Sequence, residues 1–382
     1  MNFRSYEIKD ICKIKSGKRL PKGTDFSEKP TKHKYIRARD IKNGKIDGSD
    51  LGYISEEIHK KIARYIVNTN DIIITIAGTI GEVALVSKKF DGVNLTENAV
   101  RLTEFSKDVC PEFLAYILKS PERKEYMEQV AGGSAQPKLG IYKIEAIKVD
   151  LPDIQIQHKI ADILSAYDDL IENNQKQIKL LEEAAQRLYK EWFVDLRFPG
   201  HENTKIVDGV PEGWSRTNIN EILTFHRGYD LTKNEMKAGR YPVVGSTTVI
   251  GYHNEFKIKG PGIVTGRSGS LGKYQFIWDN FWPHNTSLYI SDYKDHNIFF
   301  VYSLLQTVDF ASLNNGGAIP TLNRNVLSNI KVIEPTDELQ EMFAKIAEAQ
   351  YRKIRNLEKQ NNQLKMARDV LLPKLMSGEV EV

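Results

Sequence analysis

A heptad pattern of apolar residues runs through residues 156–193. Its positions alternate at intervals of four and three residues without a break: Ile160, Leu164, Tyr167, Ile171, Asn174, Ile178, Leu181, Ala185, Leu188 and Trp192. This period is typical of a long helix that packs along a seam on a partner helix. A helix of this length extends about 50 Å. Asn174 is the one strongly polar seam position, and such a residue fixes the register of pairing at some cost in stability.

A second helix of the same kind is predicted over residues 336–377. Its seam follows the first at an offset of 183 residues: Phe343, Ala347, Gln350, Ile354, Leu357, Asn361, Leu364, Arg368 and Leu371. The entry segments also correspond, since Gln340 falls on Gln157. Two seams of equal length most simply pack on each other as an antiparallel coiled coil. The alternative is that each helix docks separately on a globular core.

The rest of the chain is duplicated. Residues 3–11 correspond to residues 214–222 at an offset of 211, and Gly17 then falls on Gly228. Residues 78–81 correspond to 269–272 at an offset of 191, and residues 132–137 to 316–320 at about 184. The shrinking offset indicates loops of different length in a constant framework, which is the pattern of a tandem repeat.

Each copy contains basic glycine-containing loops, short β-type runs such as residues 71–77 and 262–265, and one helix, at residues 111–128 or 297–312. We therefore predict an α+β protein with two α/β domains in tandem and two long helices, related by a pseudo-two-fold axis. The expected boundaries are 1–150 for the first domain, 151–198 for the first helix, 199–213 for a linker, 214–333 for the second domain and 334–382 for the second helix and tail.

Composition indicates a soluble globular chain, with 41% hydrophobic and 27% charged residues. Its two cysteines, Cys12 and Cys110, exclude a disulfide framework, and no signal peptide is visible at the start, so we expect a cytoplasmic location without a membrane span. Residues 1–150 carry 27 Lys+Arg against 21 Asp+Glu, whereas residues 151–204 carry 6 against 10. The basic domains, rather than the acidic helices, are expected to meet a polyanion.

Motifs for catalysis are missing from the sequence. There is no G-x-x-x-x-G-K-[ST] loop for ATP phosphates and no Asn/Asp-Pro-Pro-Tyr/Phe tetrapeptide of an amino-methyltransferase. The eight histidines are scattered without the spacing of a zinc site, and no Ser–His–Asp or Cys–His order stands out. These observations favour a binding protein over an enzyme, with no metal.

Glycine-rich loops are the positive signal. Residues 266–273 (Gly-Arg-Ser-Gly-Ser-Leu-Gly-Lys) combine an arginine, two hydroxyls and a lysine on backbone that can approach a ligand closely, and arginine favours the O6 and N7 atoms of guanine. Residues 132–138 and 245–248 are similar. The alternative is that these are hairpin turns with solvated side chains. Tyr229, Trp278 and Trp282 either stack on bases or belong to the core, and residues 37–41 either contact phosphates or pair their charges on a strand.

Together these features resemble a known family. Two basic domains, each followed by a long helix, with residues 210–214 (Val-Pro-Glu-Gly-Trp) opening the second, resemble the specificity (S) subunit of type I restriction–modification systems. Residues 189–200 (Tyr-Lys-Glu-Trp-Phe-Val-Asp-Leu-Arg-Phe-Pro-Gly) are similar to the central conserved region of that family. The resemblance covers essentially the whole chain.

The resemblance implies two target-recognition domains, each reading one half of a bipartite site in double-stranded DNA. It implies a helical spacer that binds two modification subunits, which bring S-adenosylmethionine and adenine-N6 methyltransferase activity, and restriction subunits, which bring ATP, Mg and endonuclease activity. This chain itself then binds no cofactor and has no catalytic residue. Because recognition loops vary within such a family, no base-by-base assignment carries over.

Candidate DNA-binding residues are the basic and polar side chains of the loops and strand ends described above: Lys18, Arg19, Lys22, Lys34, Arg37, Arg39, Thr79, Ser134, Gln136, Lys138, Arg227, Tyr229, Lys233, Ser246, Thr247, Arg267, Ser268, Ser270, Lys273, Asn323 and Arg324. Two rival functions remain open. One is a standalone nuclease or methyltransferase with an unrecognised site, and the other is a coiled-coil adaptor that never touches DNA.

Overall fold

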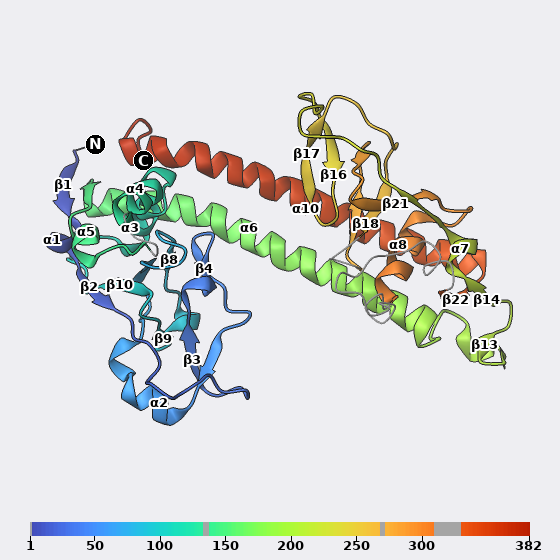
Figure 1. Cartoon of the computed structure of the whole chain (residues 1–382), viewed down its shortest axis with the longest axis horizontal. Helices are drawn as coiled ribbons and strands as arrows, with labels where there is room; N and C mark the ends of the chain where they lie inside the picture. The colour runs from blue at the N-terminus through green and yellow to red at the C-terminus, as the bar shows by residue number, and fades with distance from the viewer. Residues whose placement is uncertain (1, 133–136, 268–271, 309–329) are drawn as a thin grey trace. The chain divides into compact units, whose positions relative to one another are not determined.

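The computed structural model describes residues 2–132, 137–267, 272–308 and 330–382. It divides into two compact units: unit 1 comprises Met1–Ile171 and Gln363–Val382, and unit 2 comprises Glu172–Asn362. Both long helices, α6 (Ile154–Tyr189) and α10 (Asp337–Ser377), contribute to both units (Figure 1). Each unit is therefore a sheet-containing domain built onto a segment of a helix pair.

Unit 1 contains two main sheets. The first is an antiparallel sheet in the order β2-β10-β7-β8, and the second has the order β6-β3-β9 with β3 and β9 parallel. The strands are β1 (Arg4–Glu7), β2 (Lys13–Ser16), β3 (His33–Ile36), β4 (Ile41–Lys42), β5 (Lys45–Ile46), β6 (Gly52–Ile54), β7 (Ile72–Thr75), β8 (Val83–Leu85), β9 (Asn94–Leu95), β10 (Ala99–Thr103) and β11 (Lys148–Leu151). The helices outside α6 and α10 are α1 (Ile8–Ile11), α2 (Glu56–Lys61), α3 (Pro111–Leu118), α4 (Pro121–Ala131) and α5 (Ile141–Glu145).

Unit 2 repeats this topology. Its four-stranded sheet has the order β15-β21-β18-β19, and its three-stranded sheet has the order β17-β16-β20 with β16 and β20 parallel. The strands are β12 (Ile206–Val207), β13 (Val210–Pro211), β14 (Ser215–Asn218), β15 (Thr224–Arg227), β16 (Tyr241–Val244), β17 (Val249–His253), β18 (Gly262–Gly266), β19 (Tyr274–Ile277), β20 (Trp282–Pro283), β21 (Ser287–Asp292) and β22 (Lys331–Glu334). In the described part of unit 2, the helices outside α6 and α10 are α7 (Ile219–Ile222) and α8 (Ile298–Thr307). The predicted duplication of an α/β domain is confirmed in the two main sheets and in the pairing of β14 with β22, which repeats that of β1 with β11; the β4–β5 and β12–β13 hairpins have no counterpart among the described strands.

The helix predicted at residues 111–128 is instead two helices, α3 and α4. Ser120 lies between them and caps α4: its hydroxyl accepts a hydrogen bond from the backbone N–H of Arg123 in the first turn of that helix. Pro121 follows at the first helical position, where its missing N–H costs nothing. Because Pro121 disfavours helical backbone at the residue before it, α3 cannot continue into α4.

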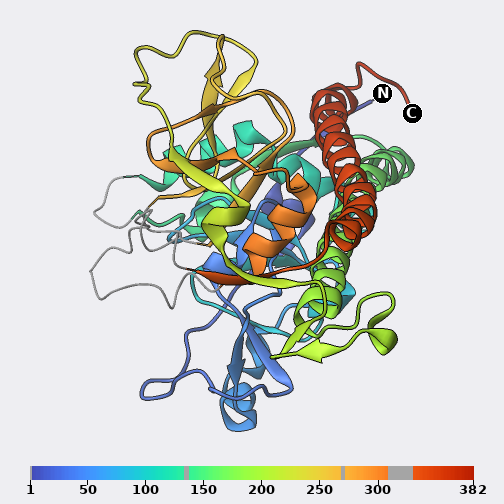
Figure 2. The same ribbon diagram turned by 90° about the vertical axis from the view of Figure 1, so that its right-hand side faces the viewer.

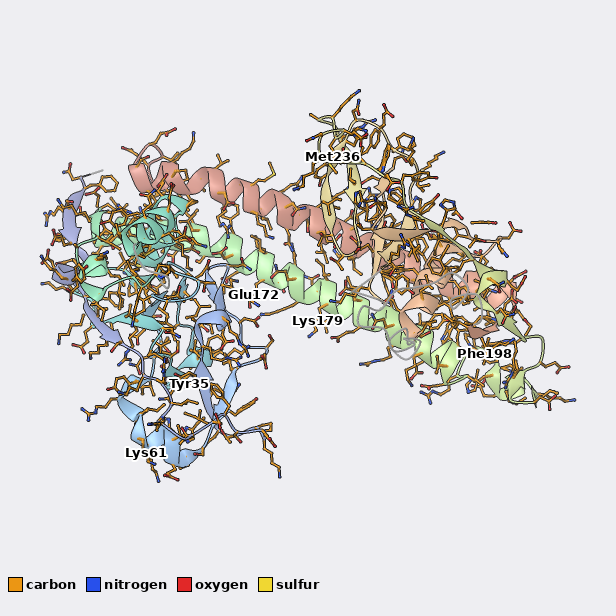
Figure 3. The ribbon with its side chains drawn as sticks, viewed as in Figure 1. Tyr35, Lys61, Glu172, Lys179, Phe198 and Met236 are labelled. Carbon is orange, nitrogen blue, oxygen red and sulfur yellow. The ribbon has the colours of Figure 1, made fainter. Side chains whose placement is uncertain are left out.

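The heptad seam is buried as predicted. Every seam position of both helices is buried or half-buried, while Lys179 of α6, labelled in Figure 3, is exposed. In unit 2, the side chain of Asn174 donates a 3.0 Å hydrogen bond to that of Asn361, and both are buried. In unit 1, Arg368 forms an ion pair with Asp168. These contacts confirm that the two helices pair rather than dock separately.

A buried glutamine joins each domain to the start of its helix. In unit 1, Gln157 accepts a hydrogen bond from the backbone N–H of Cys110 at 3.0 Å and donates to the carbonyl of Pro152 at 2.8 Å. In unit 2, Gln340 donates to the carbonyl of Pro335 at 2.9 Å and accepts from His296. The amide group suits this position because it donates and accepts at once.

The core of unit 2 is rich in aromatic rings. Tyr189 near the end of α6 packs on Phe300 of α8 and on Phe343 of α10, with ring centroids 5.8 and 5.5 Å apart. Figure 2 shows the ribbon of α8 beside those of the two long helices. Beyond α6, a π-helical turn (Lys190–Val194) carries Phe193 into the same cluster. Among the described residues, no helix is long and apolar enough to cross a membrane.

The Asn174–Asn361 pair leads to a stability prediction. Asn174→Leu leaves the Asn361 amide buried without its partner, so the free energy of unfolding should fall by about 1–3 kcal/mol in denaturant titration. The double variant Asn174→Leu/Asn361→Leu should recover this loss, because an apolar pair fills the seam without an unsatisfied amide. A double variant as unstable as the single one would contradict the pairing.

Candidate nucleic-acid interface

In unit 1, one end of the four-stranded sheet gathers several predicted residues. At this end β2 and β7 finish while β10 and β8 begin. The backbone N–H of Gly17 donates to Ala99 at 3.1 Å, that of Ile76 to Asn98 at 2.8 Å, and that of Leu139 to Ile76 at 2.9 Å. These bonds bring four loops together. We call the resulting group, Lys18, Arg19, Thr79, Glu97, Asn98 and Lys138, the polar end of unit 1.

The cations of this polar end differ in their partners. Burial raises the pKa of Glu97, but hydrogen bonds from Arg19 Nε at 2.7 Å, from the Thr96 hydroxyl and from the backbone, together with the charge of Arg19, hold this pKa below its ordinary value. Lys18 and Lys138 are exposed and form no ion pair among the described residues; the Lys18 ammonium lies 5.8 Å from the ring of Tyr65. The two lysines therefore offer unneutralised charge to an anion.

Unit 2 has a corresponding polar end, where β15 and β18 finish while β21 and β19 begin. The backbone N–H of Arg267 donates to the carbonyl of Thr286 at 3.1 Å, and the hydroxyl of Ser246 donates to the same carbonyl at 2.7 Å. The polar end of unit 2 consists of Arg227, Asp230, Ser246, Arg267, Lys273, Asn285 and Thr286.

Asp230 organises part of this group. Its carboxylate accepts a hydrogen bond from Arg227 at 3.1 Å and another from the side-chain amide of Asn285. Arg267 and Lys273 flank the β18–β19 loop, are exposed, and form no ion pair with any residue that the structure describes. They are the free cations of this end, as Lys18 and Lys138 are in unit 1.

A glycine allows close backbone approach at each polar end. A Cβ atom on Gly17 would lie 1.9 Å from the carbonyl oxygen of Thr96, and one on Gly228 would lie 2.0 Å from that of His284. Both contacts are with backbone, which cannot rotate away. The repeat of Gly17 at Gly228, visible in the sequence, is thus a requirement of strand spacing.

A buried threonine fixes the base of each hairpin loop. Thr75 in β7 donates its hydroxyl to the carbonyl of Thr79, and Thr265 in β18 donates to that of Lys273 at 2.9 Å. Both threonines are fully buried. The β7–β8 and β18–β19 loops are therefore anchored alike, although their tips differ in sequence.

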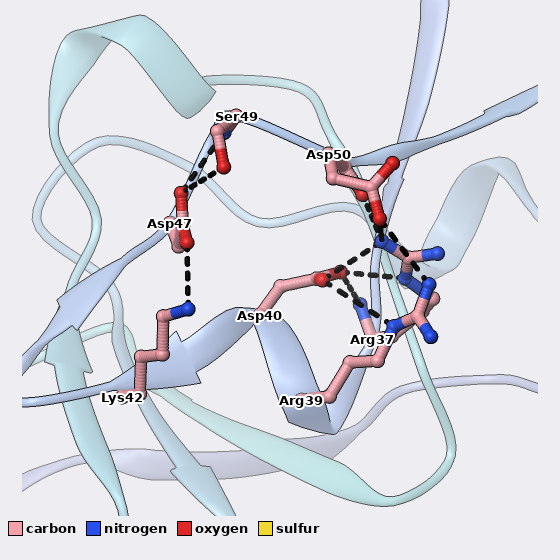
Figure 4. Close-up of polar contacts among 7 residues, drawn as sticks. All are labelled: Arg37, Arg39, Asp40, Lys42, Asp47, Ser49 and Asp50. Atoms are coloured by element: carbon pink, nitrogen blue, oxygen red, sulfur yellow. Dashed lines mark hydrogen bonds and ion pairs between the residues drawn. The ribbon is translucent and has the colours of Figure 1, made fainter. Parts of the chain in front are cut away.

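The segment at residues 37–41 pairs its charges within unit 1. Arg37 donates from Nε and Nη2 to both carboxylate oxygens of Asp40 at 2.9 Å, and Arg39 lies 3.4 Å from Asp50 (Figure 4). The segment is not the predicted strand but a 3-10 turn, Ala38–Asp40, because Asp40 also accepts the backbone N–H of Arg37 at 2.8 Å. Of the two roles expected for this stretch, internal pairing is the one observed.

The aromatic candidates lie mainly in the core. Trp282 is buried, and Tyr229 is half-buried with its hydroxyl 3.0 Å from that of Tyr289. The ammonium of Lys257 lies 4.7 Å from the Trp282 ring. Trp278 is half-buried and packs on Phe276.

The remaining candidates are not joined to a polar end by any hydrogen bond that the structure describes. Lys22, Lys233 and Thr247 are exposed on loops, and Lys34 is half-buried on β3. Ser134, Gln136, Ser268, Ser270, Asn323 and Arg324 lie outside the described residues.

Sequence reasoning missed the segments that enter β10 and β21. In unit 1, β10 is preceded by Glu97 and Asn98. In unit 2, β21 is preceded by Asn285 and Thr286, which lie 188 residues further along the chain. Aligned at that offset, the two segments share no identical residue, so self-comparison gave no signal for them. Asp230 was missed because one of its partners, Asn285, is distant in the chain. No group of three His, Cys, Asp or Glu side chains in the described segments could hold a metal ion.

Comparison with known proteins confirms the resemblance seen in the sequence. The family described as type I restriction modification DNA specificity domain matches residues 2–183 and 211–366. The MjaIX specificity subunit of Methanocaldococcus jannaschii is 28% identical over 360 residues, covering 86% of this chain and 82% of that protein. The EcoBI specificity subunit of Escherichia coli is 34% identical over 140 residues, covering 36% of this chain and 29% of that protein. The crystal structure of an S subunit from M. genitalium has the same fold, with a TM-score of 0.66 and 21% identity over 98% of this chain and 96% of that one.

The glycine contacts lead to a second stability prediction. Gly17→Ala and Gly228→Ala should each lower the free energy of unfolding by about 1–3 kcal/mol, since the new methyl group forces a backbone shift in a packed region. Gly132→Ala is the matched control, because its Cβ would lie 3.4 Å from the nearest atom, the carbonyl oxygen of Gln129. The strand-spacing account is wrong if all three variants unfold at the same denaturant concentration.

Proposed function

Because the chain belongs to the family of type I restriction–modification DNA specificity domains, we propose that it reads a bipartite target in double-stranded DNA, one half-site with each unit. It does so without catalysis. Target-recognition loops at the two polar ends select the sequence, and partner subunits act on the DNA that this chain selects.

The observation that carries this proposal is the repetition of the polar end. Two sheets of the same topology each present glycine-spaced backbone, an anchored hairpin loop and free cations at the equivalent edge. The side chains on the two frameworks differ: Lys18 and Lys138 in unit 1 correspond in role to Arg267 and Lys273 in unit 2. A constant framework with different contacts is suited to reading two different half-sites.

The chemistry of the free cations suits DNA. Phosphate contacts by lysine position a protein on the duplex without sequence preference, whereas arginine can read guanine through two parallel hydrogen bonds. In unit 2, Arg267 lies at the base of the β18–β19 loop and pairs with no carboxylate in the described part of the chain. We assign Arg267 to base readout and Lys18, Lys138 and Lys273 to phosphate contacts.

The helices serve partner proteins in this proposal. Residues 151–204 are acidic overall, and the helix surfaces expose apolar side chains such as Leu180 in unit 2 and Met366 in unit 1, which are 63% and 70% accessible. A partner that covers these helix surfaces would remove such apolar side chains from water. The partners would be two modification subunits with S-adenosylmethionine and restriction subunits with ATP and Mg, while this chain holds no cofactor.

A methyl-transfer assay separates this proposal from an enzyme. The purified chain should transfer no methyl group from S-adenosylmethionine to DNA until a modification subunit is added. Methyl transfer by the chain alone would reject the non-catalytic role. A complete lack of salt-dependent DNA binding, alone or with that subunit, would instead favour a coiled-coil adaptor.

Arg267→Ala tests base readout. Loss of a bidentate base contact should weaken binding to the cognate site by about 1–3 kcal/mol and change binding to unrelated DNA little. Arg187→Ala removes the same charge from an exposed position on α6 and should leave both affinities unchanged. Competition titrations at fixed salt give these values, and an equal loss on every sequence would make Arg267 a phosphate contact.

A further inference from the structure

Unit 2 contains a cavity that the DNA-reading role does not use. It has a volume of about 430 Å³ and lies among β19, α8, α6 and α10. Its aromatic lining comes from Tyr274, Phe276, Trp278, Tyr302 and Tyr351. A volume of this size falls within the range of small-ligand pockets, about 300–1,000 Å³.

The aromatic wall follows from strand geometry. Tyr274, Phe276 and Trp278 alternate along β19 and its end, so their side chains lie on one face. The ring of Tyr302 on α8 lies 5.2 Å from that of Phe276 and 5.2 Å from that of Tyr351 on α10. The faces of such rings attract cations. Trp278 already shows this, because the guanidinium of Arg355 lies 5.0 Å from its ring.

Two carboxylates complete the lining. Glu182 comes from α6 and Glu358 from α10, and none of the described residues that line the cavity is basic. Partial burial raises the pKa of both carboxyl groups, and the charge of Glu182 raises the pKa of Glu358 further. Neither carboxylate forms an ion pair with a residue that the structure describes. Among the described residues, the two carboxylates of the cavity thus have no paired counterion; the guanidinium of Arg355 lies against the Trp278 ring and pairs with Asp279 instead.

Unit 1 fills the equivalent place with its own cation. There, Asp168 on α6 accepts a 2.8 Å hydrogen bond from the hydroxyl of Tyr116 on α3 and pairs with the guanidinium of Arg368 on α10. The ammonium of Lys119 lies 5.4 Å from the ring of Tyr116. Carboxylate, tyrosine and guanidinium together satisfy this site.

The duplication shows what unit 2 lacks. Tyr302 corresponds to Tyr116. In unit 2, Tyr302 comes six residues after His296, which bonds to Gln340; in unit 1, Tyr116 comes six residues after Cys110, which bonds to Gln157. At the helix offset of 183 residues, Ala185 stands where unit 1 has Arg368, and Tyr351 stands where it has Asp168. Unit 2 therefore keeps the tyrosine of α3 as Tyr302, replaces both members of the ion pair, and places Glu182 and Glu358 beside the site from other helix positions.

We propose that the cavity between β19, α8 and the two long helices of unit 2 binds a guanidinium group supplied from outside this chain. The group stacks against the aromatic wall while its N–H donors meet Glu182 and Glu358, as Arg368 meets Asp168 in unit 1. Planar guanidinium suits this lining better than ammonium, because it can both stack on a ring and donate to a carboxylate. Its source is either a small free molecule or an arginine side chain of a bound protein.

Isothermal titration of the full chain with agmatine, putrescine and the peptide acetyl-Gly-Arg-Gly-amide tests the proposal. Agmatine or the peptide should bind saturably with one-to-one stoichiometry, and putrescine more weakly. Tighter binding of agmatine indicates a free ligand, and tighter binding of the peptide indicates an arginine side chain. No saturable binding of either guanidinium probe would overturn the proposal.

Variants locate the site. Glu182→Gln/Glu358→Gln should weaken guanidinium binding at least tenfold while the chain melts at or above the wild-type temperature, because two repelling carboxylates are removed. Glu183→Gln changes the same charge on α6 outside the cavity and should leave binding unchanged. Gln186 is an exposed residue of the cavity lining. In the variant Gln186→Lys, the new ammonium group should occupy the carboxylates and so weaken binding of the guanidinium probes. Equal binding to wild type and to the double Glu→Gln variant would assign the cation to surface charge and overturn the proposal.

Discussion

The buried seam between α6 and α10 is the constraint on which the rest of the structure depends. Neither sheet could stand alone, since each domain core is completed by side chains from both helices: Ile160, Leu164 and Leu375 in unit 1, and Tyr189, Phe343 and Ile354 in unit 2. Apolar burial supplies the affinity of the seam, but it does not choose a register. The polar pairs do that. Asn174 meets Asn361, and Asp168 meets Arg368, so a shifted alignment would leave buried amides and charges without partners.

On this seam, one framework is used twice with different side chains. The parts that repeat are those that backbone geometry demands: Gly17 and Gly228 beneath a crossing carbonyl, Thr75 and Thr265 at the base of a hairpin, and Gln157 and Gln340 at the helix start. The parts that differ are those that can meet a ligand. This division explains how DNA readers can diverge without loss of fold. It also explains how unit 2 can lack the Arg368 contact and retain a cavity.

The sequence was most informative where a pattern has a long period. Heptads and tandem repeats extend over many residues, so the amino-acid sequence alone predicts the helix pair, the duplication and the family. Short-range features were harder. The break at Pro121 was missed because apolar residues continue at helical spacing on both sides of it. For Arg37 the sequence left phosphate contact and internal pairing open, since one of its partners, Asp50, is distant in the chain. Asp230 was not predicted because its contact with Asn285 depends on how β15 and β21 pair. The individual DNA contacts stay predictions.

The central claim is that each unit reads one half of the target independently. Residues 214–333 can be exchanged for the corresponding segment of another family member. The chimera keeps α6, α10 and the residues of their seam from this chain. The chimera is then combined with modification subunits, and methylated adenines are mapped by sequencing across random DNA. The account predicts that one half of the methylated motif changes while the other half stays as in the wild type. A change in both halves, in a chimera that folds and supports methylation, would contradict it.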